Sequence, residues 1–180
     1  NRSISYVNSA TLLKQLSENE SINNKVLAFA PSFNGQDSNN LLALPNNKTE
    51  AADILNYFNG KMLTDSLATL QNFNTENTDF GLLHFATHAI LDDENPEYSY
   101  LAFQPDGNSN LLYVSDLYNL NSNTSLVTLS ACESGIGDLK RGEGFISLAR
   151  GFYFSGAKSI ASTLWKINDG SSLKIMEAFY

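Results

Sequence analysis

The sequence predicts an α/β domain built around a largely parallel β-sheet. Short apolar runs of strand length recur along the chain, and segments with a helical spacing of apolar residues lie between them. The longest of these runs are apolar at almost every position, as expected for strands that are covered on both faces of a sheet. The chain has 180 residues, of which 42 % are hydrophobic and 17 % are charged, and this is enough for one sizeable core. We therefore expect a single domain over residues 1–180.

The expected strands are apolar or alternating runs bounded by polar or turn-forming residues. Pro31 closes the second of them, and the turn Pro105-Asp-Gly-Asn108 follows the fifth. The runs span residues 3–7, 25–30, 61–64, 80–88, 99–104, 126–131 and 159–164.

The expected helices carry apolar residues three and four positions apart. They lie over residues 10–16, about 50–58, about 66–73, about 112–120, about 143–155 and 170–180. For the second helix, Asn47 or Thr49 is the candidate N-cap and Gly60 the stop. Asp65 is the candidate cap of the third helix, and Gly156 ends the fifth.

Charge and composition exclude several classes of partner. The formal net charge of −8 disfavours nucleic acid, because phosphate binding needs clustered Lys and Arg. No apolar run approaches the ~18 residues of a membrane span, so we expect no membrane partner. The single cysteine cannot form an intrachain disulfide and favours a reducing compartment, so we expect a cytoplasmic protein.

Both ends of the sequence suggest a piece of a longer chain. The first residue is Asn1 rather than Met, and the last expected helix reaches Tyr180 without a stop signal. We therefore expect a fragment that lacks the C-terminal part of its fold.

Two of the expected strands lead to chemically reactive side chains. His88 closes the run 80–88, and Cys132 follows the run 126–131, 44 residues later. The carboxyl ends of parallel strands meet at the edge of the sheet where α/β proteins bind ligands. A lone cysteine is by itself more typical of a small buried side chain. A thiol beside a histidine, however, has the base that it needs to become a nucleophile.

The loop after Cys132 contains Gly135 and Gly137, which permit a sharp turn and leave backbone N–H groups free to bind an oxyanion. His84 lies four residues before His88 and therefore shares its face of a strand, where we expect a structural role. His84, His88 and Cys132 could be combined into a zinc site, but His-x-x-x-His zinc chemistry needs a helix and a Glu where Phe85 stands. We therefore expect no metal and no cofactor.

Several segments resemble, in order, the CHAT peptidase family of caspase-like domains, which often follow tetratricopeptide repeats in bacterial proteins. The reactive residues lie in Leu83-His-Phe-Ala-Thr-His88 and Leu129-Ser-Ala-Cys-Glu-Ser-Gly135. The segment Ala131–Gly135 is also similar to the nucleophile segment of the legumains, which belong to the same clan. The resemblance continues at Glu50-Ala51, Arg141-Gly-Glu-Gly144, Leu148-Ala-Arg150, Ser155-Gly-Ala157 and Ser162-Thr-Leu-Trp165 through Asp169.

The resemblance implies a caspase-like three-layer α/β/α sandwich around a mostly parallel sheet. It also implies a catalytic dyad in which Cys132 is the nucleophile and His88 the acid and base. The oxyanion hole would use the backbone N–H groups of Cys132 and Ala89. The family usually has Gly at the position of Ala89, and an alanine resists the positive φ that glycine allows.

A similarity to the distantly related separases implies a substrate pocket formed by the segment Trp165–Asp169. Trp165 would form a wall of this pocket, and Asp169 would bind a basic side chain before the scissile bond. The residues Asp169-Gly-Ser-Ser also fit the N-cap of the last helix. Both roles of Asp169 stay open at this point.

Taken together, the resemblance implies a cysteine endopeptidase that cuts a protein or peptide substrate after Arg or Lys. The habit of the family implies regulation by a partner protein or by an adjoining tetratricopeptide-repeat region. Two alternatives remain. One is a scaffold that keeps the fold and binds a protein partner without catalysis, and the other is an amidase that acts on small molecules.

Overall fold

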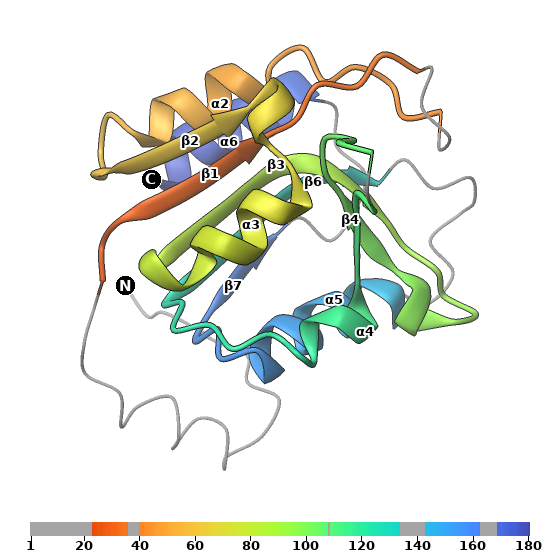
Figure 1. The fold of residues 1–180 in the computed structure, drawn as a ribbon. Helices are drawn as coiled ribbons and strands as arrows, with labels where there is room; N and C mark the ends of the chain where they lie inside the picture. The colour runs from red at the N-terminus through yellow and green to blue at the C-terminus, as the bar shows by residue number, and fades with distance from the viewer. Residues whose placement is uncertain (1–22, 36–39, 108, 134–142, 163–168) are drawn as a thin grey trace.

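The computed structural model describes residues 23–35, 40–107, 109–133, 143–162 and 169–180 (Figure 1). The predicted strand 3–7 and helix 10–16 lie outside these residues. In the described part, seven strands form one mixed sheet, which confirms the predicted α/β class. Its parallel strands are β1 (Val26–Ala30), β2 (Gly60–Thr64), β3 (Leu82–Ile90), β6 (Leu126–Glu133) and β7 (Ile160–Ser162).

The parallel strands lie side by side in the order β2-β1-β3-β6-β7. The chain therefore builds outward from β1 in one direction, crosses back, and builds outward from β3 in the other. Such a reversal leaves a crevice between β1 and β3 at the carboxyl ends of the strands, where open α/β sheets bind ligands. This order places the ends of β1, β3 and β6 next to one another.

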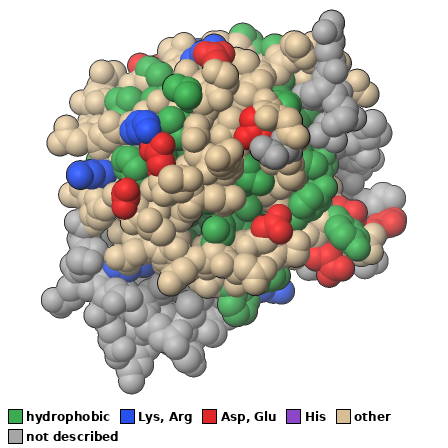
Figure 2. Space-filling model, viewed as in Figure 1, with side chains coloured by type: hydrophobic (Ala, Val, Ile, Leu, Met, Phe, Trp, Pro, Cys, Tyr) green, Lys and Arg blue, Asp and Glu red, His purple; other side chains and the backbone are tan. Residues whose placement is uncertain are grey.

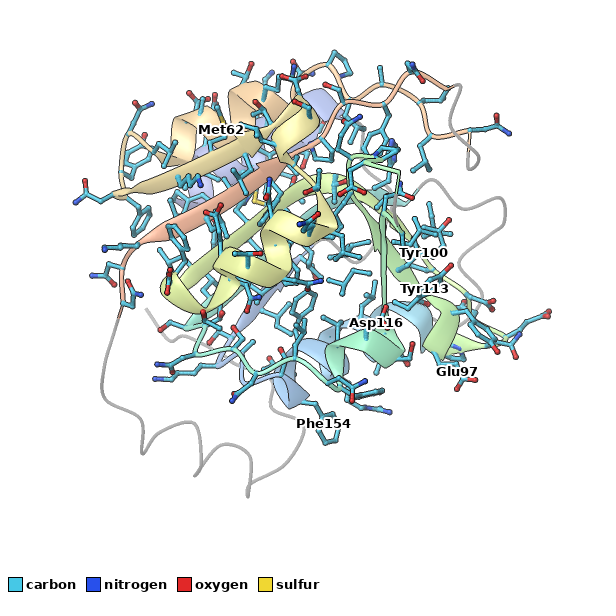
Figure 3. The ribbon with its side chains drawn as sticks, viewed as in Figure 1. Met62, Glu97, Tyr100, Tyr113, Asp116 and Phe154 are labelled. Atoms are coloured by element: carbon cyan, nitrogen blue, oxygen red, sulfur yellow. The ribbon has the colours of Figure 1, made fainter. Side chains whose placement is uncertain are left out.

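Two short strands, β4 (Tyr100–Ala102) and β5 (Leu111–Tyr113), extend the sheet in antiparallel fashion beyond the end of β3. Tyr100 and Tyr113 are opposite each other in this ladder, with their ring centroids 5.4 Å apart (Figure 3). Residues 112–120 were expected to form one helix, which is wrong for their first part. Leu111–Tyr113 instead pairs with β4, and only Val114–Leu117 (α4) is helical.

Helices cover both faces of the sheet (Figure 1). On one face, α2 (Asn47–Ile54) and α6 (Asp169–Phe179) contact each other and the strands β3 and β6. On the other face, α3 (Leu70–Glu76), α4 and α5 (Glu143–Phe154) contribute to the main core. The described part of the chain thus forms the three layers expected of a caspase-like sandwich.

The main core is aromatic, and it fills the face under α3 and α5. The rings of Phe29 and Phe85, on neighbouring strands, are stacked with centroids 5.4 Å apart. Phe73, Phe103 and Phe152 surround this pair, and all five side chains are buried. The face under α2 is lined instead by small or polar residues of the strands, so α2 and α6 approach the backbone closely there.

Two predicted boundaries are wrong near the carboxyl ends of the strands. The strand that was expected to end at His88 continues to Ile90, because β4 pairs with its last two residues. The strand before Cys132 likewise includes this residue and ends at Glu133. Both candidate catalytic residues therefore lie within paired strands rather than in the loops that follow them.

Two predicted helix caps are also wrong. Asp65 does not cap α3; it begins a 3₁₀ turn, has a φ of 50°, and binds Ser32 and Lys48 through its carboxylate. These two hydrogen bonds hold the pKa of Asp65 below its ordinary value. The cap of α3 is Thr69, whose hydroxyl accepts from the N–H of Asn72. In α2, Asn47 is already the first helical residue, and its side chain reaches β3 instead.

The surface in the view of Figure 2 carries scattered charged side chains. Lys and Arg do not gather into a patch on this face. Among the helices of the described segments, none is long and apolar enough to cross a membrane.

Candidate active site

The site is organised by the register of two central strands. β3 and β6 are paired from Leu82 and Leu126 onward, and this register makes His88 and Cys132 direct neighbours. Strands in a sheet are about 4.8 Å apart, so the two backbones are as close as separate strands can be. The structure thus brings together the two residues that the sequence predicted as a dyad.

The opposite edge of β3 opens beside His88. β1 pairs with β3 only as far as Phe85, and β4 begins to pair at Ala89. Residues 86–88 therefore have no strand next to them on this edge. This unpaired stretch of β3 lies where the strand order reverses, between β1 and β3.

The imidazole of His88 is held by a backbone carbonyl. Its side chain is buried, and Nε2 lies 2.7 Å from the carbonyl oxygen of Leu42. A carbonyl can only accept, so Nε2 must carry the proton of this hydrogen bond. In the neutral ring, Nδ1 is then the basic nitrogen. This tautomer is the one in which His88 can accept a proton at Nδ1 while remaining anchored at Nε2.

An apolar wall lies beside the ring of His88. The ring of Phe33 is tilted against it, with the centroids 4.9 Å apart. Phe33 belongs to a cluster with Leu41 and Ala102, which Ile90 and Tyr100 extend. These side chains exclude water from one side of the imidazole and restrict its rotation.

Ala89, the residue expected to contribute to an oxyanion hole, lies inside β3 next to Glu133 of β6. Its side chain is buried in the main core. Among the described non-glycine residues, only Asn40 and Asp65 have a positive φ. An alanine therefore fits the backbone at this position without strain, although glycine is usual in the family.

Of the two residues predicted for the substrate pocket, only Asp169 lies among the described residues. Trp165 lies outside the described residues. Asp169 is the first residue of α6, so its backbone lies in the first turn of this helix. As the first helical residue, Asp169 is not itself the residue before the helix, so its N-cap role and its substrate-binding role both stay predictions.

A buried polar network lies on the same two strands, further from their carboxyl ends than His88 and Cys132. His84 and Thr128 are registered neighbours, four residues before His88 and Cys132. Nε2 of His84 lies 2.9 Å from Oε1 of Glu50 in α2, and its Nδ1 lies 3.2 Å from the hydroxyl of Tyr180. The structural role expected for His84 thus takes the form of contacts with both helices of this layer.

Tyr180 completes this network at the end of α6. Its hydroxyl donates to Oγ1 of Thr128 at 2.6 Å. Burial and the neighbouring carboxylate of Glu50 raise the pKa of Tyr180 to about 12, against the opposing effect of the Thr128 hydrogen bond. Within the described segments, no group of three His, Cys, Asp or Glu residues is arranged to hold a metal ion.

The loop after β3 contacts the start of α5. The carboxylate of Asp93, in the acidic loop after β3, accepts from the N–H of Gly144 at the start of α5. A Cβ atom on Gly144 would lie 2.7 Å from Oγ of Ser99 and 2.9 Å from the N of Asp92. Glycine therefore lets α5 begin directly against the segment that follows His88.

Sequence reasoning missed the carbonyl of Leu42 and the amide of Asn47. A backbone carbonyl has no signature in a sequence. Asn47 and Glu50 did leave one, because they are polar residues on the same helical face as Ala51 and Ile54. Such residues on a buried face indicate specific polar contacts.

The comparison with known families agrees with this geometry. The family model described as CHAT domain matches residues 1–180. This family is related to the caspase-like peptidases. No curated protein matches the sequence. Since the match extends over the whole chain, the protein belongs to the CHAT domain family.

Proposed function

We propose that this domain is a cysteine endopeptidase in which Cys132 and His88 form the catalytic dyad. The observation that carries the proposal is the register that makes these residues neighbours on β3 and β6. Registered residues of adjacent strands project from the same side of a sheet, which favours a meeting of thiol and imidazole. The carbonyl of Leu42 adds support, because it leaves Nδ1 of His88 as the basic nitrogen.

The reaction follows from these roles. Nδ1 of His88 accepts the thiol proton, and the thiolate of Cys132 attacks the carbonyl carbon of the peptide bond. The C–N bond then breaks as the imidazolium donates its proton to the leaving amine, and a thioester remains. His88 next removes a proton from water, whose oxygen attacks the thioester. The C–S bond breaks, the acid product leaves, and the imidazolium returns its proton to the sulfur.

Charge appears twice in this sequence of steps, and we assign a group to each. The positive charge on the imidazole is stabilised by the Leu42 carbonyl, which accepts from Nε2. The negative charge on the substrate oxygen would be bound by the backbone N–H groups of Cys132 and Ala89.

The proposed specificity is for Arg or Lys before the scissile bond, within a protein substrate. Asp169 would bind the basic side chain, and Trp165 would form the pocket wall. The position of α6 supports this role for Asp169. Oγ of Ser172, one helical turn after Asp169, lies 2.5 Å from Oγ of Ser130, which precedes Cys132 by two residues. We further propose that a partner protein or an adjoining tetratricopeptide-repeat region regulates the enzyme in the bacterial cytoplasm.

A peptidyl electrophile that ends in Arg tests the proposal directly. We expect it to label Cys132 in the wild-type chain, as measured by mass spectrometry of the intact protein. His88→Ala should abolish labelling and peptide cleavage, and Cys132→Ala should abolish both without changing the circular dichroism spectrum. Unchanged turnover in either variant would refute the dyad. Binding of a protein partner without labelling would favour the scaffold, and cleavage of simple amides without preference for peptides would favour the amidase.

A further inference from the structure

One continuous segment makes three polar contacts along the α2 face of β3. His84, Ala86 and His88 alternate with residues of the opposite face, so they form a single row. Glu50 contacts His84, Asn47 contacts Ala86, and Leu42 contacts His88. As β3 advances toward its carboxyl end, the segment 42–50 runs back along it.

The middle contact is made by the amide of Asn47, whose side chain is buried. Its Nδ2 donates to the carbonyl oxygen of Pro31 at 2.8 Å and to that of Ala86 at 3.2 Å. An NH₂ group has two hydrogens and can therefore serve two acceptors at once. Both carbonyls lie where β1 and β3 stop pairing, since their ladder ends at Phe29 and Phe85. Asn47 thus links β3 to the residue after β1 at the point where the two strands no longer pair.

The contact between Glu50 and His84 lies one helical turn further along α2. Both side chains are almost completely buried, and their nearest atoms are 2.9 Å apart. Two contacts on successive turns fix the rotation of α2 about its axis as well as its height above β3. The start of the helix, and the segment that leads into it, therefore have a defined position relative to His88.

We propose that Asn47 is a positioning residue for His88 and acts through the carbonyl of Leu42. Asn47 lies five positions after Leu42, and the exposed Pro45 between them restricts the backbone of this connection. With the amide in place, the Leu42 carbonyl faces Nε2 of His88 and selects the tautomer with the proton on Nε2. The catalytic consequence of this selection rests on the proposed peptidase function, whereas the tautomer itself does not.

The test measures the tautomer of His88 by ¹⁵N NMR of the full chain labelled at histidine. The chain has two histidines, and His84→Gln assigns the signals. In the wild type, Nε2 of neutral His88 should show the shift of a protonated nitrogen. In Asn47→Ala this shift should move toward that of an unprotonated nitrogen, as the second tautomer becomes populated. The accompanying kcat/KM for peptide cleavage should fall by up to about 100-fold, mainly in kcat.

Asn77→Ala is the matched control. Asn77 is also a buried amide that donates to a main-chain carbonyl, that of Phe73, but it lies before β3, far from the carboxyl end. It should destabilise the fold without changing the His88 tautomer. A second variant, Pro45→Gly, changes an exposed residue and leaves the Asn47 contacts in place. It should shift the tautomer in the same direction as Asn47→Ala and remains measurable if that variant does not fold.

An unchanged His88 tautomer in both Asn47→Ala and Pro45→Gly would overturn the proposal, whatever their stability. A tautomer shift in a chain that has no peptidase activity would leave the positioning role intact and refute the proposed function instead. The two failures can therefore be told apart.

Discussion

The hydroxyl of Tyr180 donates a 2.6 Å hydrogen bond to Thr128, four residues before Cys132 on the same strand. The end of α6 is thereby fastened to the strand that carries the proposed nucleophile. The bond is partly buried, and the phenol also contacts His84. The stability of this attachment should depend on the protonation of Tyr180, because burial and the nearby carboxylate of Glu50 disfavour the phenolate.

We expect Tyr180 to make the free energy of unfolding pH-dependent in the alkaline range. Its pKa is about 12 in the folded chain and near 10 for an ordinary tyrosine, so the folded state holds the proton more tightly. The resulting stabilisation is complete below pH 10 and is lost as the pH rises toward 12, by an amount of the order of 2 kcal/mol. Urea denaturation of wild type and Tyr180→Phe between pH 8 and about 12 measures it.

At pH 8, Tyr180→Phe should be less stable than wild type by about 1 kcal/mol, the value of a typical lost hydrogen bond. This difference should shrink and then change sign as the pH rises. Tyr57→Phe is the control, because Tyr57 is exposed and its substitution should leave the curve unchanged. A constant difference between wild type and Tyr180→Phe at all pH values would contradict the prediction.

Removing the carboxylate of Glu50 should be strongly destabilising. Glu50 and His84 are both buried and lie 2.9 Å apart, so Glu50→Ala leaves the buried Nε2 of His84 without the carboxylate. The expected loss is about 3–5 kcal/mol, measured by urea denaturation. The exposed pair of Lys61 and Glu76 provides the comparison, and Lys61→Ala should cost less than about 1 kcal/mol. If Glu50→Ala and Lys61→Ala lowered the free energy of unfolding equally, the buried contact of Glu50 would be no more stabilising than an exposed ion pair.

The parts of the fold that the sequence predicted are those decided by runs of apolar residues. β3 and β6 carry such runs, and the position of a reactive side chain near the end of each was readable from the sequence alone. Their direct pairing also requires the strand order, which depends on how the connections cross the sheet. That order was available only through the resemblance to a known family.

The parts that could not be predicted depend on single polar groups with several possible partners. Asp65 and Asn47 both have side chains that commonly cap helices, and the sequence favoured that role. In the structure, Lys48 and Ser32 bind the first, and the carbonyls of Pro31 and Ala86 bind the second. These partners are brought close only by the folded sheet, so no local pattern indicates them.

We expect Phe33→Ala to lower the kcat/KM of the proposed peptide cleavage, per folded molecule, and also the free energy of unfolding. The Phe33 ring packs against the ring of His88 and is buried, so its loss should cost about 3–5 kcal/mol and free the imidazole to rotate. Phe73→Ala should cost as much, but Phe73 belongs to α3 and packs in the main core, not against His88. Comparing kcat/KM per folded molecule separates the two effects. Equal activities in the two variants would mean that Phe33 does not restrain His88.

Adding a methyl group at Gly144 should separate the start of α5 from the loop that follows β3. The Cβ of Gly144→Ala would lie 2.9 Å from the N of Asp92 and 2.7 Å from Oγ of Ser99, so α5 or the loop after β3 must shift. The shift would weaken the hydrogen bond from Gly144 to Asp93. We expect a loss of about 1–3 kcal/mol in stability, measured by urea denaturation, and a loss of peptide cleavage greater than the unfolded fraction explains.

Gly151→Ala is the matched control within the same helix. Its Cβ would lie 2.8 Å from the side chain of Leu117, which belongs to α4, so this variant is also overpacked. Its contact does not involve the loop after β3, and its effect should be confined to stability. If the contact between Gly144 and Asp93 helps to arrange the site, only Gly144→Ala should slow cleavage by the folded protein. If both variants lose activity in proportion to their loss of stability, the contact between Asp93 and Gly144 has no part in arranging the site.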